Sequence, residues 1–549
     1  MGSGGESCVI IIIMCVNLVN VDKQFINYNV CVEQVLRYCY YLWLRLGNKR
    51  FEDLREFLTL PSPSTLKNMN LKMNVNGDGF QKNVFLELKK LLDSKASCPE
   101  DYEVILSWDA TGYHKKLQYD KNTGALLGVD SDPERFSAHN MFDNQVNCFM
   151  VTSPQKKFNK LKFPVAYYHG SSLNSADIRR QVSEVMTGLD NIGVRVVCVV
   201  CDGASEHHKY FKMILDETSE FDNTIKVRQG LVWAVSDAPH LIKKFRNNWL
   251  SSGFRSRHTR LLTKNGFHIG WSIMDAIYTV STTLSNGRAR HLTILPKLIF
   301  DVVSPTSIQR LRVSLAAIPF SKDVRNFVIS NLDRLINESR LREGDIMLTF
   351  EYMSVVDELF QIMNSRYPIT WTDTCDPSGS PIGLKDLCDT SKGHSLGFFS
   401  KIFGVSEKYL MDISGLPSPD SVPPPDMKLI IDRPSRLLKI AEYFTDWNTQ
   451  IQSIPNLTSK QREKMFITHW LFTDLRRTCL SMVEMIKYYI PKSHRCWVPR
   501  RFNQDVIEST FGQIRNLAGS NTNMDRRTVN TGFSERRSVG LKDLHVKRT

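Results

Sequence analysis

The sequence predicts an α/β protein whose mixed-sheet core is split by a large, mainly α-helical insertion. Short β-type runs separated by turn residues fill the segment 102–235, and helical patterns dominate from about residue 250 to 490. The 549 residues also exceed what one hydrophobic core usually supports. With 42% apolar and 23% charged residues, the composition is that of a globular protein rather than a disordered or fibrous one.

The N-terminal part should form a small module beside this core. The apolar run 9–16 is shorter than the ~20 residues of a membrane span and lacks the basic flank of a signal peptide, so we leave 1–29 unassigned and expect no membrane partner. Apolar positions between Val32 and Leu58 predict two short amphipathic helices. We interpret 30–98 as a helical module, either helix-turn-helix-like or a structural brace.

The first part of the core is expected over 99–250. Strands are predicted at 103–108, 116–119, 146–151, 164–168, 194–201 and 231–235, with helices at 175–189 (capped by Ser175), 205–215 and 241–249. The main order, β-β-β-α-β-α-β-α, is the order of RNase H-like folds. Residues 251–490 are then the insertion, with loops at 370–381 and 416–425, and 491–525 return to the core as its last helix. The basic end, 526–549, is expected to be a flexible phosphate-binding tail.

The charge balance favours a nucleic acid as partner. Lys and Arg outnumber Asp and Glu by 71 to 57, a formal charge of +14. No acid occurs between Asp237 and Asp275, a stretch that follows the last core strand. Its basic side chains could neutralise DNA phosphates, a solvated helix face being the alternative. The DNA-binding candidates are Lys243, Lys244, Arg246, Arg255, Arg257 and Arg260.

The twelve cysteines are scattered at low density, which favours reduced thiols inside the cell rather than a disulfide scaffold. Cys198 and Cys201 form a CxxC motif, but they lie in a β-branched run with no second pair at zinc-finger spacing. We therefore interpret them as part of a buried strand.

Two aspartates follow apolar strands directly. Asp109 comes after 104–108 and Asp202 after 196–201, so neighbouring strands would bring both carboxylates to one edge of the sheet. Glu508, on an amphipathic helix, is the candidate for a third carboxylate, and Asp505 is its rival or a helix cap. Three carboxylates of this kind could hold two Mg²⁺ ions for in-line displacement at phosphorus, although turn aspartates are common enough that spacing alone carries little weight. His240 is a secondary candidate for a phosphate contact, and Trp271 could stack on a base but is better explained by burial.

Several segments resemble the core of P-element-type transposases, including THAP-domain-containing homologues. They are Ser107-Trp-Asp-Ala, Gly193 to Gly203, Ser236-Asp-Ala-Pro-His-Leu-Ile-Lys-Lys, Leu311 to Ala317 and Phe502 to Arg515, with Gly519-Ser-Asn-Thr-Asn beyond. The resemblance spans about residues 50 to 525. It implies that Asp109, Asp202 and Glu508 are the Mg²⁺-binding catalytic triad of a DNA-cutting and DNA-joining enzyme. It also implies guanine nucleotide (GTP) binding in the insertion, for which no phosphate-cradling motif names residues.

One departure concerns the N-terminus, where such proteins usually carry a zinc-coordinating THAP domain. No suitably spaced Cys and His set precedes residue 100.

The first hypothesis is a nuclear DNA transposase or transposase-derived protein. It should be a homo-oligomer, because two DNA ends must be held together. The second hypothesis is a domesticated, catalytically inactive DNA-binding or interaction protein on the same scaffold. A different RNase H-like nuclease is a third possibility, which the long separation of Asp202 from Glu508 disfavours.

Overall fold

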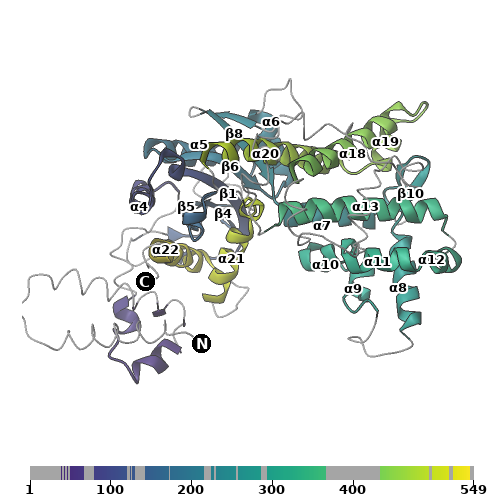
Figure 1. Ribbon diagram of the computed structural model, residues 1–549. Coiled ribbons are helices and arrows are strands. Elements are labelled where there is room, and N and C mark those ends of the chain that lie inside the picture. Colours follow the sequence, from purple (N-terminus) through teal and green to yellow (C-terminus); the bar gives the residue numbers. More distant parts are fainter. Residues whose placement is uncertain are drawn as a thin grey trace, which may run out of the picture. The chain divides into compact units, whose positions relative to one another are not determined.

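A computed structural model describes most of the core and much of the insertion (Figure 1). The described residues are 39, 42–43, 46, 50–66, 79–119, 124, 126–129, 142–171, 173–214, 224–227, 230–254, 258–285, 294–339, 341–365, 433–493, 498–517 and 524–543. The apolar run 9–16 and the expected loops 370–381 and 416–425 lie outside them. Among the described helices, none is both long and apolar enough to cross a membrane.

Contacts divide the chain into two compact units, and each is described by itself. Unit 1 comprises 1–153, 157–196 and 505–549, and unit 2 comprises 154–156 and 197–504. The six strands of the main sheet follow the order β5-β4-β1-β6-β8-β7, and β6 begins in unit 1 and continues into unit 2. This mixed sheet confirms the predicted α/β, RNase H-like class.

Unit 1 is built on three antiparallel strands, β1 (Glu103–Gly112), β4 (Gln145–Thr152) and β5 (Phe163–Gly170). β1 is longer than predicted because its pairing with β4 continues through Asp109↔Cys148 to Gly112↔Gln145. Asp109 therefore lies within the strand, and the prediction that it follows the strand end is wrong. The predicted strand at 116–119 forms only the short β2 (Gln118–Tyr119), which pairs with β3 (Leu126–Leu127) outside the main sheet.

Helices cover this half of the sheet. α4 (Lys82–Asp93) contacts β5, and α5 (Ser175–Asn191) follows β5 in the chain. The cap of α5 is Asn174, whose side chain accepts from the Asp177 amide, rather than the predicted Ser175. Near the N-terminus, a small buried cluster is formed by Cys39, Trp43, Phe51, Leu60 and Leu66.

The C-terminal segment differs from the prediction. Residues 526–543 form helix α22 (Arg526–Asp543) instead of a flexible tail. α22 and the preceding helix α21 (Asp505–Leu517) share a core cluster with β4 and β5 to which α22 contributes Val529 and Phe533, and Phe533 stacks on Tyr167 with ring centroids 4.6 Å apart. Burying these apolar side chains outweighs the basic composition that suggested disorder.

Unit 2 contains the parallel pair β6 (Arg195–Cys201) and β8 (Gly230–Ser236), with β7 (Thr224–Val227) antiparallel to β8. Helices α6 (Ser205–Ile214) and α7 (Ala238–Leu250) follow the strands as predicted. Helix α20 (His469–Ser493), which the sequence assigned to the insertion, lies along β8: Thr478 Oγ1 accepts from Ser236 N at 2.9 Å, and Ser481 Oγ donates to Ala234 O at 2.8 Å. The end of the insertion thus helps to form the core.

The described insertion is mainly helical, apart from the hairpin β9 (Leu262–Lys264) and β10 (Phe267–Ile269). Its aromatic core includes Trp249, Trp271, Phe320, Tyr352 and Trp447. Trp271 is buried and donates to Val303 O, so burial rather than base stacking accounts for it. Its helices are α8 (Ser272–Leu284), α9 (Phe300–Val303), α10 (Val313–Ala317), α11 (Lys322–Ser330), α12 (Leu332–Ser339), α13 (Glu343–Met363), α18 (Arg433–Ser453) and α19 (Ser459–Met465), with short 3-10 turns at Gln309–Leu311 and Ile318–Phe320. Outside the insertion, 3-10 turns lie at Pro99–Tyr102, Lys156–Phe158 and Pro499–Arg501.

Candidate active site

Asp109 projects from β1 toward the sheet face that carries α21. Residues paired across an antiparallel ladder point to the same face, and the partner of Asp109 is Cys148, a member of the core cluster shared with α21 and α22. Burial raises the pKa of the Cys148 thiol, and the Asp109 carboxylate makes a smaller contribution in the same direction. This contribution agrees with the two side chains lying on the same face. Asp109 itself is half-buried, and its Oδ1 accepts from the Ala110 amide at 2.8 Å.

Glu508 lies in the first turn of α21, on the same face of unit 1. Its neighbour Ile507 is fully buried in the core cluster, whereas Glu508 is exposed. Further along the helix, Arg515 Nη2 donates to Thr111 Oγ1 at 2.9 Å, which ties α21 to β1 two residues beyond Asp109. Asp505 begins the helix and is half-buried. Unit 1 therefore presents Asp109 and Glu508 from elements that pack on each other.

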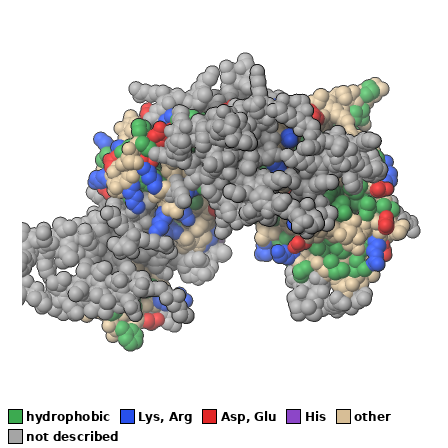
Figure 2. All heavy atoms as spheres, in the orientation of Figure 1, with side chains coloured by type: hydrophobic (Ala, Val, Ile, Leu, Met, Phe, Trp, Pro, Cys, Tyr) green, Lys and Arg blue, Asp and Glu red, His purple; other side chains and the backbone are tan. Residues whose placement is uncertain are grey.

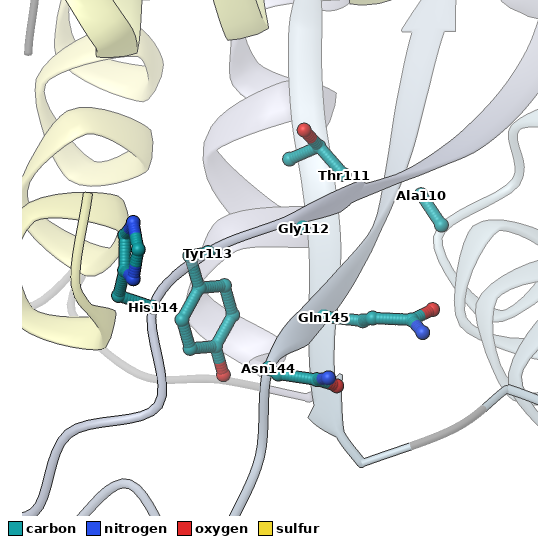
Figure 3. A pocket seen from close by; sticks show the side chains of 7 residues that line it. All are labelled: Ala110, Thr111, Gly112, Tyr113, His114, Asn144 and Gln145. Atoms are coloured by element: carbon teal, nitrogen blue, oxygen red, sulfur yellow. The ribbon is translucent and has the colours of Figure 1, made fainter. Parts of the chain in front are cut away.

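An open cavity of about 440 Å³ begins one residue after Asp109 (Figure 3). It lies where the β1–β4 ladder ends, and Figure 3 shows the Asn144 and Gln145 amides extending to the same side as Ala110. The full lining is Ala110, Thr111, Gly112, Tyr113, His114, Asn144 and Gln145. These side chains are largely polar, so the surface next to Asp109 can accept a hydrated, hydrogen-bonding substrate.

Asp202 follows β6 directly, as predicted. Its Oδ1 accepts from the Ala204 amide at 2.9 Å and lies 2.7 Å from His207 Nδ1, and Gly203 between them has a φ of 65°. Burial alone would raise the pKa of Asp202, but the hydrogen bond and charge of His207, the Ala204 amide and the nearby His240 hold it well below its usual range. The carboxylate is therefore ionised at physiological pH.

His207 is a part of this site that the sequence reasoning missed. Burial of the ring opposes protonation, but the side chains of Cys201 and Asp202 outweigh it and raise the pKa of His207 to about 10. The ring is thus a buried imidazolium that faces the half-buried carboxylate of Asp202. The signal in the sequence was the position of His207, which lies five residues after Asp202 and in the first turn of α6.

A second acid, Asp237, organises the start of α7. It is buried and caps the helix: Oδ2 accepts from His240 N at 3.0 Å and lies 2.8 Å from His240 Nδ1, while Oδ1 accepts from Gln504 N at 2.7 Å. Its own amide donates to Cys201 O at 3.0 Å. Burial disfavours the charged ring of His240, but Asp237, helped by Asp202, raises its pKa. The His240 ring therefore takes up a proton more readily than a free imidazole and lies near Asp202, compatible with its predicted role as a secondary site residue.

Three of the predicted DNA-binding residues, Lys244, Arg246 and Arg260, direct their side chains toward other parts of the protein. Arg246 is fully buried, with Nε donating to Asn247 Oδ1 and Nη2 to Arg310 O, so its assignment as a DNA contact is wrong. Lys244 Nζ is turned toward Gly203 O and Asp474, and Arg260 Nη1 donates to the carbonyls of Glu463 and Phe466.

For the other basic candidates a DNA contact stays a prediction. Lys243 is half-buried, and Arg255 and Arg257 lie outside the described residues.

An apolar surface occurs elsewhere on unit 2, where Figure 2 shows hydrophobic side chains exposed over the part of the insertion that contains α9 to α12. Its large members are Phe300, Ile308, Leu311 and Ile329, each at least 44% exposed. This apolar surface differs in character from the polar surface beside Asp109. Exposed apolar patches commonly mark interaction sites.

The carboxylate chemistry suits Mg²⁺, a hard cation that prefers oxygen ligands. Asp202 is ionised, and Asp109 and Glu508 extend from elements of unit 1 that pack together. Within the described ranges, no three His, Cys, Asp or Glu side chains are grouped closely enough to hold a metal ion. The triad of Asp109, Asp202 and Glu508 therefore stays a prediction drawn from the sequence.

Comparisons with known proteins support the resemblance seen in the motifs. Residues 77–214, which contain Asp109 and Asp202, match the family model of the TNP-like, RNase H N-terminal domain. Among solved structures, the chain is similar to that of the Drosophila P element transposase strand transfer complex, with a TM-score of 0.62, 17% identity, and coverage of 94% of this chain and 93% of that one. No curated protein matches. The predicted resemblance to P-element-type transposases is confirmed, and at this identity the structural likeness establishes the fold.

Proposed function

We propose that this protein is a DNA transposase, or a protein derived from one, that cleaves phosphodiester bonds and transfers DNA strands. The observation that carries the proposal is the position of Asp202, an ionised carboxylate directly after a buried strand within a transposase-type RNase H domain. Asp109, within the same matched domain, and Glu508, on the helix packed against β1, supply further oxygen ligands. Likeness to a strand transfer complex supports DNA as the substrate.

In this proposal Asp109, Asp202 and Glu508 bind Mg²⁺. When bound, such ions would supply the activation of a water or a 3′-hydroxyl and the stabilisation of the leaving oxygen. The protein's own contribution is to hold these carboxylates in place and, at Asp202, to keep the carboxylate ionised. His240 and the open polar surface beside Asp109 bind phosphate and sugar oxygens of the DNA.

The test is a cleavage and joining assay with the purified full-length chain. A labelled duplex with a free 3′-hydroxyl is incubated with plasmid DNA and Mn²⁺ or Mg²⁺. Loss of a metal-binding carboxylate removes a ligand that every turnover needs, so we expect Asp202→Ala, Asp109→Ala and Glu508→Ala to abolish product formation. Asp505→Ala tests the rival acid and should retain product. Equal products from wild type and Asp202→Ala would contradict the metal-site assignment.

A matched control comes from the same region. Glu206 lies in the first turn of α6, four residues after Asp202, and forms an exposed ion pair with Lys209 at 3.0 Å, so Glu206→Ala removes an acid near the site without touching the proposed ligands. It should cleave and join like wild type. Thermal unfolding of each variant separates loss of chemistry from loss of fold.

The proposal extends to the setting of the reaction. DNA substrates place the protein in the nucleus, and the need to hold two DNA ends calls for a homo-oligomer. GTP binding remains part of the proposal on resemblance alone, without assigned residues.

A second candidate is a domesticated protein that binds DNA or a partner but no longer cleaves. The observation that favours it is the ion pair between Asp202 and His207, because an imidazolium 2.7 Å from the carboxylate competes with a metal ion for the same negative charge. On this alternative the wild-type chain binds duplex DNA but yields no metal-dependent product. Restored cleavage in His207→Gln would instead show that the pair inhibits an intact catalytic centre.

A further inference from the structure

The turn that carries Asp202 contacts an ion pair between two distant parts of unit 2, in which Asp474 is buried and Lys244 is half-buried. Lys244 of α7 places Nζ 2.6 Å from Gly203 O and 3.0 Å from Asp474 Oδ2. Asp474, on α20, has a side chain only 1% exposed. A single ammonium group therefore joins the backbone of the Asp202 turn to the long helix that lies along β8.

The fit is too close for a side chain at the intervening residue. Gly203 has a φ of 65°, a left-handed conformation that favours glycine. A Cβ there would lie 2.5 Å from Asp474 Oδ2 and 2.5 Å from Lys244 Nζ, closer than atoms can approach. The ion pair thus lies directly against the Gly203 backbone, and the ends of both side chains would have to move to admit a Cβ.

The surrounding groups leave Lys244 as the cation that Asp474 engages most closely. His208 Nε2 is 3.4 Å from Asp474 Oδ2, but burial, only partly offset by Asp474, lowers the pKa of His208 to about 4, so its ring is neutral at physiological pH. The ring of His208 also stacks on Trp470, with centroids 4.5 Å apart. Asp474 Oδ1 is buried without a hydrogen-bond partner in the structure. Removing Lys244 would therefore leave a buried, uncompensated carboxylate next to the turn.

We propose that Lys244 and Asp474 are positioning residues that hold the Asp202 turn in the geometry needed to bind a divalent cation. Lys244 acts through the Gly203 carbonyl, and Asp474 orients Lys244. This role replaces the phosphate contact predicted for Lys244 from charge alone. The inference rests on the proposed function, because it presumes that Asp202 is a metal ligand.

The test compares variants that break the ion pair with one that removes both charges. Lys244→Met leaves Asp474 unpaired and should lower both thermal stability and Mn²⁺ affinity. The double variant Lys244→Met/Asp474→Leu removes the uncompensated charge, so stability should largely return, while Gly203 O still lacks its donor. Residues that orient metal ligands typically change metal affinity 10- to 100-fold, so we expect Mn²⁺ to bind the double variant about 10-fold more weakly than wild type.

A matched control is the buried pair of Lys264 and Glu351, which joins β9 to α13 at 2.8 Å with side chains 11% and 6% exposed. Lys264→Met/Glu351→Leu should leave Mn²⁺ affinity unchanged. Mn²⁺ binding to the full-length chain is measured by calorimetry, and hydrogen exchange at the Ala204 amide, which donates to Asp202 Oδ1, reports the turn directly. Exchange should be faster in the Lys244 variants and unchanged in the control.

The outcomes separate the inference from the proposed function. Wild-type Mn²⁺ affinity in Lys244→Met/Asp474→Leu, with affinity lost in Asp202→Asn, would overturn the positioning role alone. Unchanged affinity in Asp202→Asn would overturn both, because Asp202 would not be a ligand. Weak binding in the double variant at near wild-type stability is the result that supports the inference.

Discussion

Replacing Asp237 by alanine tests how α7 and the segment before α21 are held together. The carboxylate caps α7 through His240 N and also accepts from Gln504 N, the amide of a fully buried residue. Loss of a helix cap costs about 1 kcal/mol. Leaving a buried N–H without an acceptor costs about 1–3 kcal/mol more. Asp237→Ala should therefore destabilise unit 2 by about 2–4 kcal/mol.

The measurement is urea unfolding followed by circular dichroism, with Thr458→Ala as a matched control. Thr458 caps α19 by accepting from the Gln461 amide at an exposed position, so its loss should cost only the capping energy, about 1 kcal/mol. Equal destabilisation by the two substitutions would refute the reasoning, because it would mean that the bond to Gln504 contributes nothing.

The effect of Asp237→Ala should also depend on pH. Asp237 raises the pKa of His240 above its ordinary value of 6.5, so the stability from this pair is fully present below that value and is lost as pH rises through the folded-state pKa. The difference between wild type and Asp237→Ala should therefore shrink in alkaline solution. A difference that grows with pH would contradict this assignment.

Three further substitutions probe other features. Gly203→Ala should cost more in urea unfolding than Gly193→Ala, because its Cβ must displace the ends of the Lys244 and Asp474 side chains in addition to adopting a left-handed backbone conformation, a strain of about 1–3 kcal/mol. Gly193, with a φ of 71° and open space around its Cβ position, carries the strain alone, so equal costs would argue against the close contact. Phe533→Ala should destabilise unit 1 by about 3–5 kcal/mol because the ring is fully buried, and a negligible change would favour a mobile tail. Lys157→Met should move the acid unfolding transition to higher pH. Burial opposes ionisation of Asp101, but the hydrogen bond from Lys157 and neighbouring groups lower the pKa of Asp101 to about 2, so the stability from this pair is present above pH 3.8 and is lost on acidification toward pH 2. An unshifted acid transition would show that the Lys157–Asp101 pair does not stabilise the fold.

The main strands and the position of Asp202 could be predicted because they depend on local pattern. The β-branched run ends at Cys201, and a glycine with positive φ follows two residues later, so sequence and structure agree on the strand end. β1 was predicted too short because its last residues alternate polar and small side chains. Their place in the strand is fixed by pairing with β4, which the local pattern does not encode.

The roles of individual charged residues could not be predicted, because they depend on partners far away in the chain. Arg246 is buried against the carbonyl of Arg310, 64 residues later, and Lys244 against Asp474, 230 residues later. A run of basic residues therefore indicates charge but not which side chains face solvent. Helix α22 had a local signal that was overlooked, since Val529 and Phe533 are spaced four residues apart on one helical face.

The packing of α22 on β5 has a consequence for how the protein is made. Arg537 donates to Pro164 O, a partner 373 residues earlier, and Phe533 completes the cluster around Tyr167. During synthesis β5 leaves the ribosome long before this helix exists, so one apolar face of the early strands stays uncovered while the whole insertion is translated. The unit that contains Asp109 can therefore close only after α21 and α22 have emerged, and we expect nascent chains that stop before residue 505 to need chaperones.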